Sequence, residues 1–599
     1  MILQSLAKYY DILAQDEQSG IPRPGYGMVN VSYALVLSKN GELINVLPLK
    51  NKNAKGKEIP QKRLVPEPVK KTSGVSSNFL CENSSYMLGV DKKGKPERAK
   101  QCFESFKALH VKLLSEVDCD AARAVVSYVT NWDPDKAGEH EALTDCLDEL
   151  CDGGGIVFRL DGSGFIHEDQ LVLAAWERYK NAPSSSAMLP CLVTGELAPA
   201  ARLHPSIKGV RGAQSVGAAI VSFNARAYDS YGHNEEQGLN APVSERATFA
   251  YTTVLNHLIT DSAHRLFLGD TTVVFWAETT DPGYQDYAAI LFDPSELEEK
   301  ILTSAPARDE RAVREVKGVL KKIANGAPIG NYTEAFDNNV SFYVLGISPN
   351  AARLAVRFFV CDSFGRFVEK TALHYEHLRI QKRSPKEPDI LSLWRLLNET
   401  VSPKASDKSP SPLLAGSVLR AILAGQPYPT QLFNAVLTRI RAGDEISYCK
   451  AAIIKAYLIR KNIKTGKNKE ELTVGLNKNS DNKAYLFGRL FAVLEKAQLD
   501  ANRGINSTIK DRYFTSACST PASVFPNLVK LSQNHTSKGE YGKVYEKLIS
   551  EIYELMKMEG QPYPPRLTSE EQGIFILGYY HQHNSFYAKK EDNKEDKES

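Results

Sequence analysis

Residues 31–49, VSYALVLSKNGELINVLPL, contain two apolar segments on either side of the pair Asn40-Gly41. An Asn-Gly pair readily adopts the positive φ angles of a type I′ turn, which joins two antiparallel strands. The stretch therefore predicts a β-hairpin near the start of the chain. The first region of the protein should accordingly contain sheet.

Helices and further strands are predicted around this hairpin. Apolar residues at helical spacing indicate a short amphipathic helix over residues 2–13 and a second helix over about 97–114. Up to about residue 387 we therefore expect mixed α and β structure. The remaining predicted strands are 155–160, 188–194, 218–224, 271–277, 341–347 and 353–360, and the helices between them lie near 168–181, 244–260 and 308–325.

The pattern changes at about Pro388, where every apolar segment takes a period of 3.6 residues. Residues 462–482 are polar and rich in Gly and Asn, which predicts a linker, and helical segments resume after it. The fold class is thus α+β, with a mixed α/β N-terminal region followed by an all-α region that ends in a helical bundle. The expected domains are 1–120, 121–387, 388–465 and 479–588, and 589–599 should be a disordered tail.

Length and composition are those of a folded protein with several domains. The chain has 599 residues, of which 42% are hydrophobic and 24% charged. It has no apolar run of about 18 uncharged residues, and its start does not resemble a signal peptide. Its nine cysteines include no C-x-x-C pair, which favours reduced thiols. We therefore expect a cytoplasmic protein without membrane contact.

The charges are segregated along the chain, although the net charge is only +3. Residues 50–100 carry +8, residues 111–180 carry −9 and residues 439–512 carry +8. Clustered Lys and Arg attract phosphates, so the two basic segments are candidates for nucleic-acid contact. The alternative is that each charge run is a solvated face.

No motif for catalysis, a metal or a cofactor is recognisable. The chain lacks a GxxxxGK[ST] loop, and the spacing in GAQSVG (212–217) is one residue too long for GxSxG. The pairs His374/His377 and His581/His583 have no third metal ligand at a recognisable spacing. We therefore expect no catalytic residue, no bound metal and no cofactor, and a binding role becomes the better hypothesis.

Two glycine-containing basic segments offer the chemistry that grips a sugar-phosphate chain. Lys and Arg supply charge, Ser, Thr, Asn and Gln supply hydrogen bonds, and glycine lets the backbone approach a phosphate. The alternative for each is an ordinary surface loop. The candidate residues are Lys70, Lys71, Thr72, Ser73, Gly74 and Asn78 in the first segment, and Lys208, Arg211, Gln214, Ser215 and Asn224 in the second.

A third candidate surface lies in the C-terminal bundle. Its basic residues recur at spacings that could form a stripe, which would hold a backbone without reading bases. The alternative is a solvated helix face. The residues are Arg489, Lys496, Arg503, Lys510 and Arg512.

Several long motifs resemble one known family, the large subunit of the type I-C CRISPR surveillance complex, Cascade. The resemblance covers nearly the whole chain and is weakest over 283–335, 462–478 and the charged tail. The motifs include MILQSLAKYYDIL (1–13), VPEPVKKTSGVSSNFLCENSSYMLGVD (65–91), CLVTGELAPAARLHPSIKGVRGAQSVGAAIVSFNARAYDSYG (191–232), FYVLGISPNAARLAVRFF (342–359), TIKDRYFTSACSTPASVFPNL (508–528) and EEQGIFILGYYHQ (570–582).

The resemblance implies a non-catalytic, RNA-guided role. A subunit of this kind sits at the 5′ end of the CRISPR RNA, recognises the protospacer-adjacent motif on double-stranded DNA, stabilises the R-loop and recruits the helicase-nuclease. The other implied partners are the backbone and 5′-handle-binding subunits and a small subunit that resembles the C-terminal bundle, translated from about Val474. Two alternatives stay open: an unrecognised metal-dependent nucleic-acid enzyme, and a structural scaffold without DNA contact.

Overall fold

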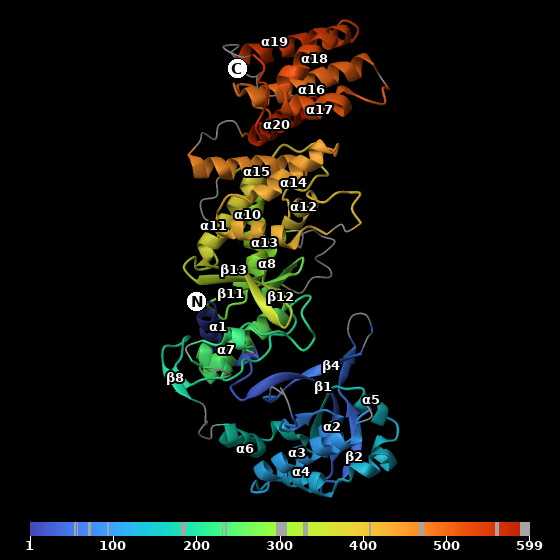
Figure 1. Ribbon diagram of the computed structural model, residues 1–599, viewed down its shortest axis with the longest axis vertical. Helices are drawn as coiled ribbons and strands as arrows, with labels where there is room; N and C mark the ends of the chain where they lie inside the picture. Colours follow the sequence, from blue (N-terminus) through green and yellow to red (C-terminus); the bar gives the residue numbers. More distant parts are fainter. Residues whose placement is uncertain are drawn as a thin grey trace, which may run out of the picture. The chain divides into compact units, whose positions relative to one another are not determined.

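The structure is a computed structural model, and the chain divides into two units, residues 1–207 with 216–257 and residues 208–215 with 258–599 (Figure 1). Each unit is described by itself. The residues that the structure describes are 1–52, 56, 58–69, 74–92, 95–180, 187–223, 225–230, 232–233, 236–294, 308–327, 333–406, 409–466, 472–502, 504–556 and 562–587. The predicted tail, 589–599, lies outside them.

The first unit is built on a seven-stranded sheet whose long central strand is β1 (Tyr26–Leu37). The predicted hairpin is confirmed, because β1 pairs antiparallel with β2 (Leu43–Pro48) around Asn40-Gly41. β1 also pairs antiparallel with β4 (Glu58–Pro66) and parallel with β6 (Gly155–Leu160). The short strands of this sheet are β3 (Lys50–Lys52), β5 (Cys81–Glu82) and β7 (Gly164–Phe165).

The helices of the first unit bury an apolar side against this sheet and against one another. Phe106 of α3 (Pro96–Leu114), Tyr128 of α4 (Asp120–Asn131) and Trp176 of α6 (Gln170–Lys180) share one apolar cluster with Leu35 and Phe158 of the sheet. Burial of these large side chains supplies most of the free energy that holds the unit folded. The other helices are α1 (Ile2–Leu13), α2 (Ser84–Met87), α5 (Leu147–Cys151) and α7 (Glu245–Thr260).

Two predicted strands of the first unit differ from the structure. Residues 218–223 form no strand; Ala218 makes one isolated bridge to Ile207, and its side chain is buried by packing alone. The predicted strand 188–194 ends early, because β8 (Met188–Pro190) gives way to a turn in which Gly195 N donates to Cys191 O over 2.7 Å. β8 pairs with β9 (Leu197–Pro199). An apolar run cannot by itself distinguish a strand from a buried loop.

The second unit begins with a four-stranded antiparallel sheet in the order β10-β11-β12-β13. The strands are β10 (Arg265–Leu268), β11 (Thr271–Ala277), β12 (Ser341–Asn350) and β13 (Arg353–Ser363). Two helices, α8 (Gly283–Phe292) and α11 (Phe364–Leu378), pack on it, and α10 (Glu310–Asn325) packs on both of these helices. The predicted strands at 271–277, 341–347 and 353–360 are confirmed.

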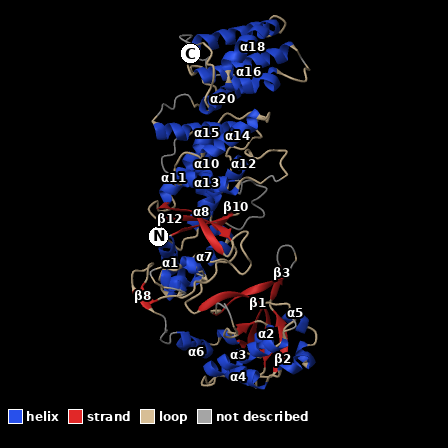
Figure 2. Cartoon of the chain, in the orientation of Figure 1, coloured by secondary structure: helices blue, strands red, loops and turns tan. Residues whose placement is uncertain are grey.

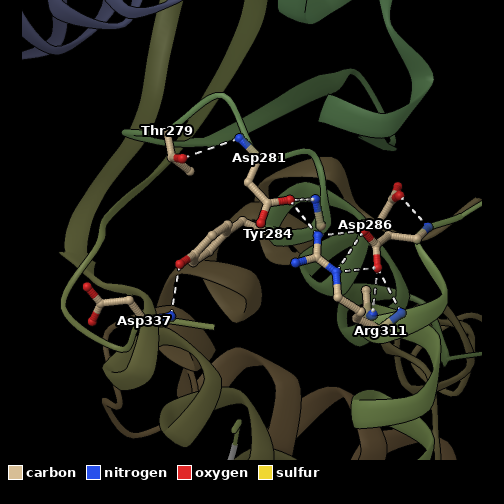
Figure 3. Close-up of polar contacts among 9 residues, drawn as sticks. Thr279, Asp281, Tyr284, Asp286, Arg311 and Asp337 are labelled. Atoms are coloured by element: carbon tan, nitrogen blue, oxygen red, sulfur yellow. Dashed lines mark hydrogen bonds and ion pairs between the residues drawn. The ribbon is translucent and has the colours of Figure 1, made fainter. Parts of the chain in front are cut away.

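A network of charged groups joins the start of α8 to the start of α10 (Figure 3). Arg308 Nη1 donates to Asp286 Oδ1 over 2.8 Å, and both side chains are largely buried. Arg311 Nη2 donates to Asp281 Oδ1 over 2.8 Å and to Asp309 Oδ2 over 2.7 Å. The Arg311 guanidinium lowers the pKa of Asp309, which also caps α10. These charge-assisted hydrogen bonds hold the two helix ends in one arrangement.

Helices alone follow β13 in the described part of the chain (Figure 2), so the predicted all-α region is confirmed. One apolar cluster extends from the second sheet through these helices to α20. The helices are α12 (Leu393–Asn398), α13 (Pro412–Leu423), α14 (Thr430–Arg441), α15 (Tyr448–Thr465), α16 (Lys483–Ala501), α17 (Ile509–Ser519), α18 (Pro521–Thr536), α19 (Gly542–Leu555) and α20 (Ser569–Ser585).

Between α15 and α16 the described residues of the predicted linker (462–482) form no helix or strand after Thr465. α15 continues to Thr465, and Leu472 and Ser480 are buried. Gln381 N donates to Val474 O over 2.8 Å, which fixes this polar segment to the body of the unit. Polar composition predicted a linker here but did not reveal this backbone pairing.

Two glycines let α16 and α20 pack with their backbones in contact. A Cβ atom at Gly488 would lie 1.9 Å from Phe575 O, and one at Gly578 would lie 2.1 Å from Tyr485 O. No side chain fits at either position. The close approach brings the flanking apolar residues of both helices into one core.

We expect Gly488→Ala to lower the free energy of unfolding by at least about 1–3 kcal/mol, because overpacking forces the two helices apart. Gly416→Ala is the matched control, since a Cβ at this buried position in α13 would meet no atom within 4 Å. It should stabilise the protein by roughly 0.5–1 kcal/mol through the helix propensity of alanine. Scanning calorimetry measures both, and equal unfolding temperatures for the two variants would contradict the close packing.

Candidate nucleic-acid interface

The first basic loop comprises residues 69–83, and Asn78 makes hydrogen bonds within it. Val69 N donates to Asn78 Oδ1 over 2.8 Å, and Asn78 N donates to Glu82 Oε1 over 3.1 Å. Gly74 is exposed in the left-handed region, with φ of 83°. Lys70, Lys71, Thr72 and Ser73 lie outside the described residues. Asn78 thus has a structural role here in addition to the predicted contact with nucleic acid.

A buried histidine anchors the end of the same loop. Leu80 N donates to His110 Nε2 over 2.9 Å, and His110 Nδ1 lies 2.7 Å from Phe106 O, so the ring proton is on Nδ1. Phe79 stacks on both His110 and Trp176, with ring centroids 5.0 and 5.3 Å apart. Burial lowers the pKa of His110 to about 4. The neutral ring therefore holds Leu80 in a left-handed conformation, with φ of 59°.

In the second basic segment, residues 208–217 form what we call the second basic loop, and four of the five predicted residues are exposed to solvent there. Ile207 and Ala218 pair at its base through two hydrogen bonds of 2.9 Å. Arg211 N donates to the buried Thr272 Oγ1 over 3.0 Å. The exposed residues are Lys208, Arg211, Gln214 and Ser215, whereas Asn224 lies outside the described residues. These four side chains are therefore accessible to a ligand.

Three side chains beside this loop were not predicted from the sequence. Val216 is 71% exposed at the end of the loop. On β10, the ring of Phe267 faces the guanidinium groups of Arg265 and Arg211, whose Cζ atoms lie 5.1 and 5.6 Å from the ring centroid. Arg265 and Phe267 stand two residues apart, so the period-2 alternation of a strand places them on one side. That alternation in RLFL (265–268) was the signal available in the sequence.

The third candidate set does not form one exposed stripe. Arg489 is only 3% exposed; its Nε donates to Gln582 Oε1 over 3.1 Å, and burial lowers its pKa. Lys510 lies over the Tyr579 ring at 5.1 Å, and burial lowers its pKa as well. Lys496 forms an ion pair with Asp500 at 2.8 Å.

The last two members of this set are Arg503 and Arg512. Arg512 is exposed, and Arg503 lies outside the described residues. Spacing along the chain did not reveal that Arg489 faces α20, because α16 is buried on several sides.

One histidine of each pair considered for a metal is hydrogen-bonded to a buried tyrosine. His374 Nδ1 is hydrogen-bonded to the Tyr428 hydroxyl, and His581 Nδ1 to the Tyr485 hydroxyl over 2.9 Å. Among the described residues no group of three or more His, Cys, Asp or Glu side chains could hold a metal ion. Within the same residues, no helix has the length and apolar character required to cross a bilayer.

Comparison with known protein families identifies the chain. The family model described as CRISPR-associated protein (Cas_Csd1) matches residues 6–587. The chain therefore belongs to this CRISPR-associated family, which supports the expectation of a Cascade-type subunit. A comparison with curated individual proteins found no match.

We expect the first unit to lose stability as the pH falls from about 6.5 to 4. Folding lowers the pKa of His110, so between pH 6.5 and pH 4 the unfolded chain binds a proton at this residue and the folded chain does not. The contribution of the neutral histidine to stability, which is complete above pH 6.5, is therefore lost as the pH falls toward 4. A shift of this size is worth about 3 kcal/mol.

His110→Gln, which cannot titrate, should therefore show a smaller drop in unfolding temperature between pH 7 and pH 5 than the wild-type protein. His140→Gln, at a partly exposed histidine of the same unit, should keep the wild-type drop. An unchanged pH dependence in His110→Gln would exclude this histidine as the cause.

Proposed function

We propose that this chain is the large subunit of a type I-C CRISPR surveillance complex. It binds the 5′ end of the CRISPR RNA, recognises the protospacer-adjacent motif on double-stranded DNA, stabilises the R-loop and recruits the helicase-nuclease. The observation that carries the proposal is the match of the Cas_Csd1 family model to residues 6–587.

The second basic loop has the chemistry that such a subunit requires. Base pairing with the guide reads the target, so the protein needs to read only a short motif and hold the backbone. The exposed Gln214 amide can pair with a base edge, while Lys208 and Arg211 can neutralise phosphates. Because Arg211 N is fixed to Thr272, part of the loop is ordered before nucleic acid binds.

In this proposal the subunit permits cleavage of DNA by the helicase-nuclease and does not itself cleave DNA. Incubation of the purified chain with DNA and Mg²⁺ should therefore leave the DNA intact. The C-terminal bundle, from about Val474, corresponds in this proposal to the separately made small subunit, and the remaining partners are the backbone and 5′-handle-binding subunits.

Replacing Lys70 and Lys71 together by alanine should weaken binding of target DNA. The slope of the logarithm of the binding constant against the logarithm of the salt concentration should fall by roughly one unit for each phosphate that is no longer neutralised. The control is Lys317→Ala with Lys321→Ala, at two exposed lysines of α10. An unchanged salt slope in the Lys70/Lys71 variant would remove this loop from the interface.

Gln214→Ala and Lys208→Ala should have different effects on the binding of DNA. A missing bidentate hydrogen bond to a base costs roughly 1–3 kcal/mol of discrimination, so Gln214→Ala should relax the choice of motif more than the total affinity. Lys208→Ala should lower affinity for all motifs alike. Binding of the assembled complex to a library of randomised motifs measures both effects, and identical profiles for the two variants would contradict this division of roles.

A further inference from the structure

A cavity of about 970 Å³ opens in the second unit beside the second basic loop. Much of its lining is apolar or aromatic and comes from α8, α11 and α13, with Phe292, Tyr375 and Ile422 among the residues, while Asp293 and Arg308 add charged groups. Its lining also includes Arg211 and Arg265. A cavity of this size, apolar within and polar at a few points, is typical of a site for a small organic group.

The two arginines lack acidic partners. Neither Arg211 nor Arg265 has a carboxylate within ion-pair distance among the residues that the structure describes, although Arg265 Nη1 donates to Ile259 O. Their neighbours differ in this respect, because Arg357 pairs with Asp270 at 3.6 Å and Arg308 with Asp286 at 2.8 Å. Two uncompensated guanidinium groups that share one aromatic ring form an attractive site for an anion.

Exposed aromatic rings accompany these cations. Phe267 is 38% exposed and Trp394 is 46% exposed, and both line the cavity. The chain's other described tryptophans are more buried. Aromatic side chains that remain half in water beside arginines provide the stacking surface on which proteins bind unpaired bases.

We propose that this cavity binds one unpaired nucleotide, with its base against Phe267 and Trp394 and its phosphate on Arg211 and Arg265. A phosphate alone would gain nothing from the aromatic rings, and an apolar peptide would gain nothing from two arginines that have no carboxylate partner. The proposal deepens the proposed function by naming a site for single-stranded nucleic acid that is separate from reading of the motif. The same chemistry would also hold a free nucleotide.

The test uses the full-length chain and three ligands. They are a labelled thymidine oligonucleotide of about ten units, the same sugar-phosphate backbone without bases, and free thymidine monophosphate. Fluorescence anisotropy reports binding of the two strands, and quenching of tryptophan fluorescence reports entry of a base. Phe267→Ala is compared with the wild type and with Arg314→Ala, which removes an exposed charge from α10 outside the cavity.

Phe267→Ala should weaken binding of the oligonucleotide by about tenfold, within the range for the loss of one stacked base, and leave binding of the baseless backbone unchanged. Arg211→Ala with Arg265→Ala should weaken binding of both strands, and Arg314→Ala of neither. Quenching should disappear in Trp394→Phe. If thymidine monophosphate saturates the protein at a lower concentration than the oligonucleotide does, the preferred ligand of the cavity is a free nucleotide.

An equal effect of Phe267→Ala on both strands, or no effect on either, would overturn the proposal. Motif-dependent binding of duplex DNA by the assembled wild-type complex separates this result from the proposed function. If that binding persists while the cavity variants behave as wild type, only the nucleotide site is wrong. If it is absent while the oligonucleotide results hold, only the role in motif recognition is wrong.

Discussion

The direct contact between the backbones of α16 and α20 is the constraint on which the C-terminal half of the second unit depends. Gly488 and Gly578 meet the carbonyls of the opposite helix, and a Cβ atom at Gly573 would lie 2.9 Å from the Phe433 ring and 3.2 Å from the Ile454 side chain. α20 is therefore held between α16 on one side and α14 and α15 on another. Buried polar groups need hydrogen-bond partners, and several of those on α20 find them on α16.

That requirement explains the polar side chains inside the bundle. The Tyr579 hydroxyl donates to Glu495 Oε2 over 2.7 Å, Arg489 donates to Gln582, and Tyr485 is bonded to His581. Each bond links α16 to α20. Residues that look like a nucleic-acid contact or a metal ligand in the sequence are thus committed to the core of the bundle, which leaves the loops beside the sheets as the better candidates for binding.

Local patterns predicted most elements of the fold. Asn40-Gly41 specified the first hairpin, and the 3.6-residue period after Pro388 specified the helices, because both signals arise within a few residues. Two predictions failed where distant contacts decide: residues 218–223 form no strand, and Arg489 faces another helix. For the candidate site, the sequence indicated the loop but not Phe267 and Arg265, since their partner Arg211 is remote in the chain.

Hydrogen–deuterium exchange on the assembled complex, with and without target duplex, tests most directly that this chain engages DNA through its basic loops. Amides of residues 208–217 and 69–83 should become protected when a duplex with the correct motif is added, and those of α10 should not change. Tight, motif-dependent binding of the duplex without any change in exchange at either loop would contradict the account.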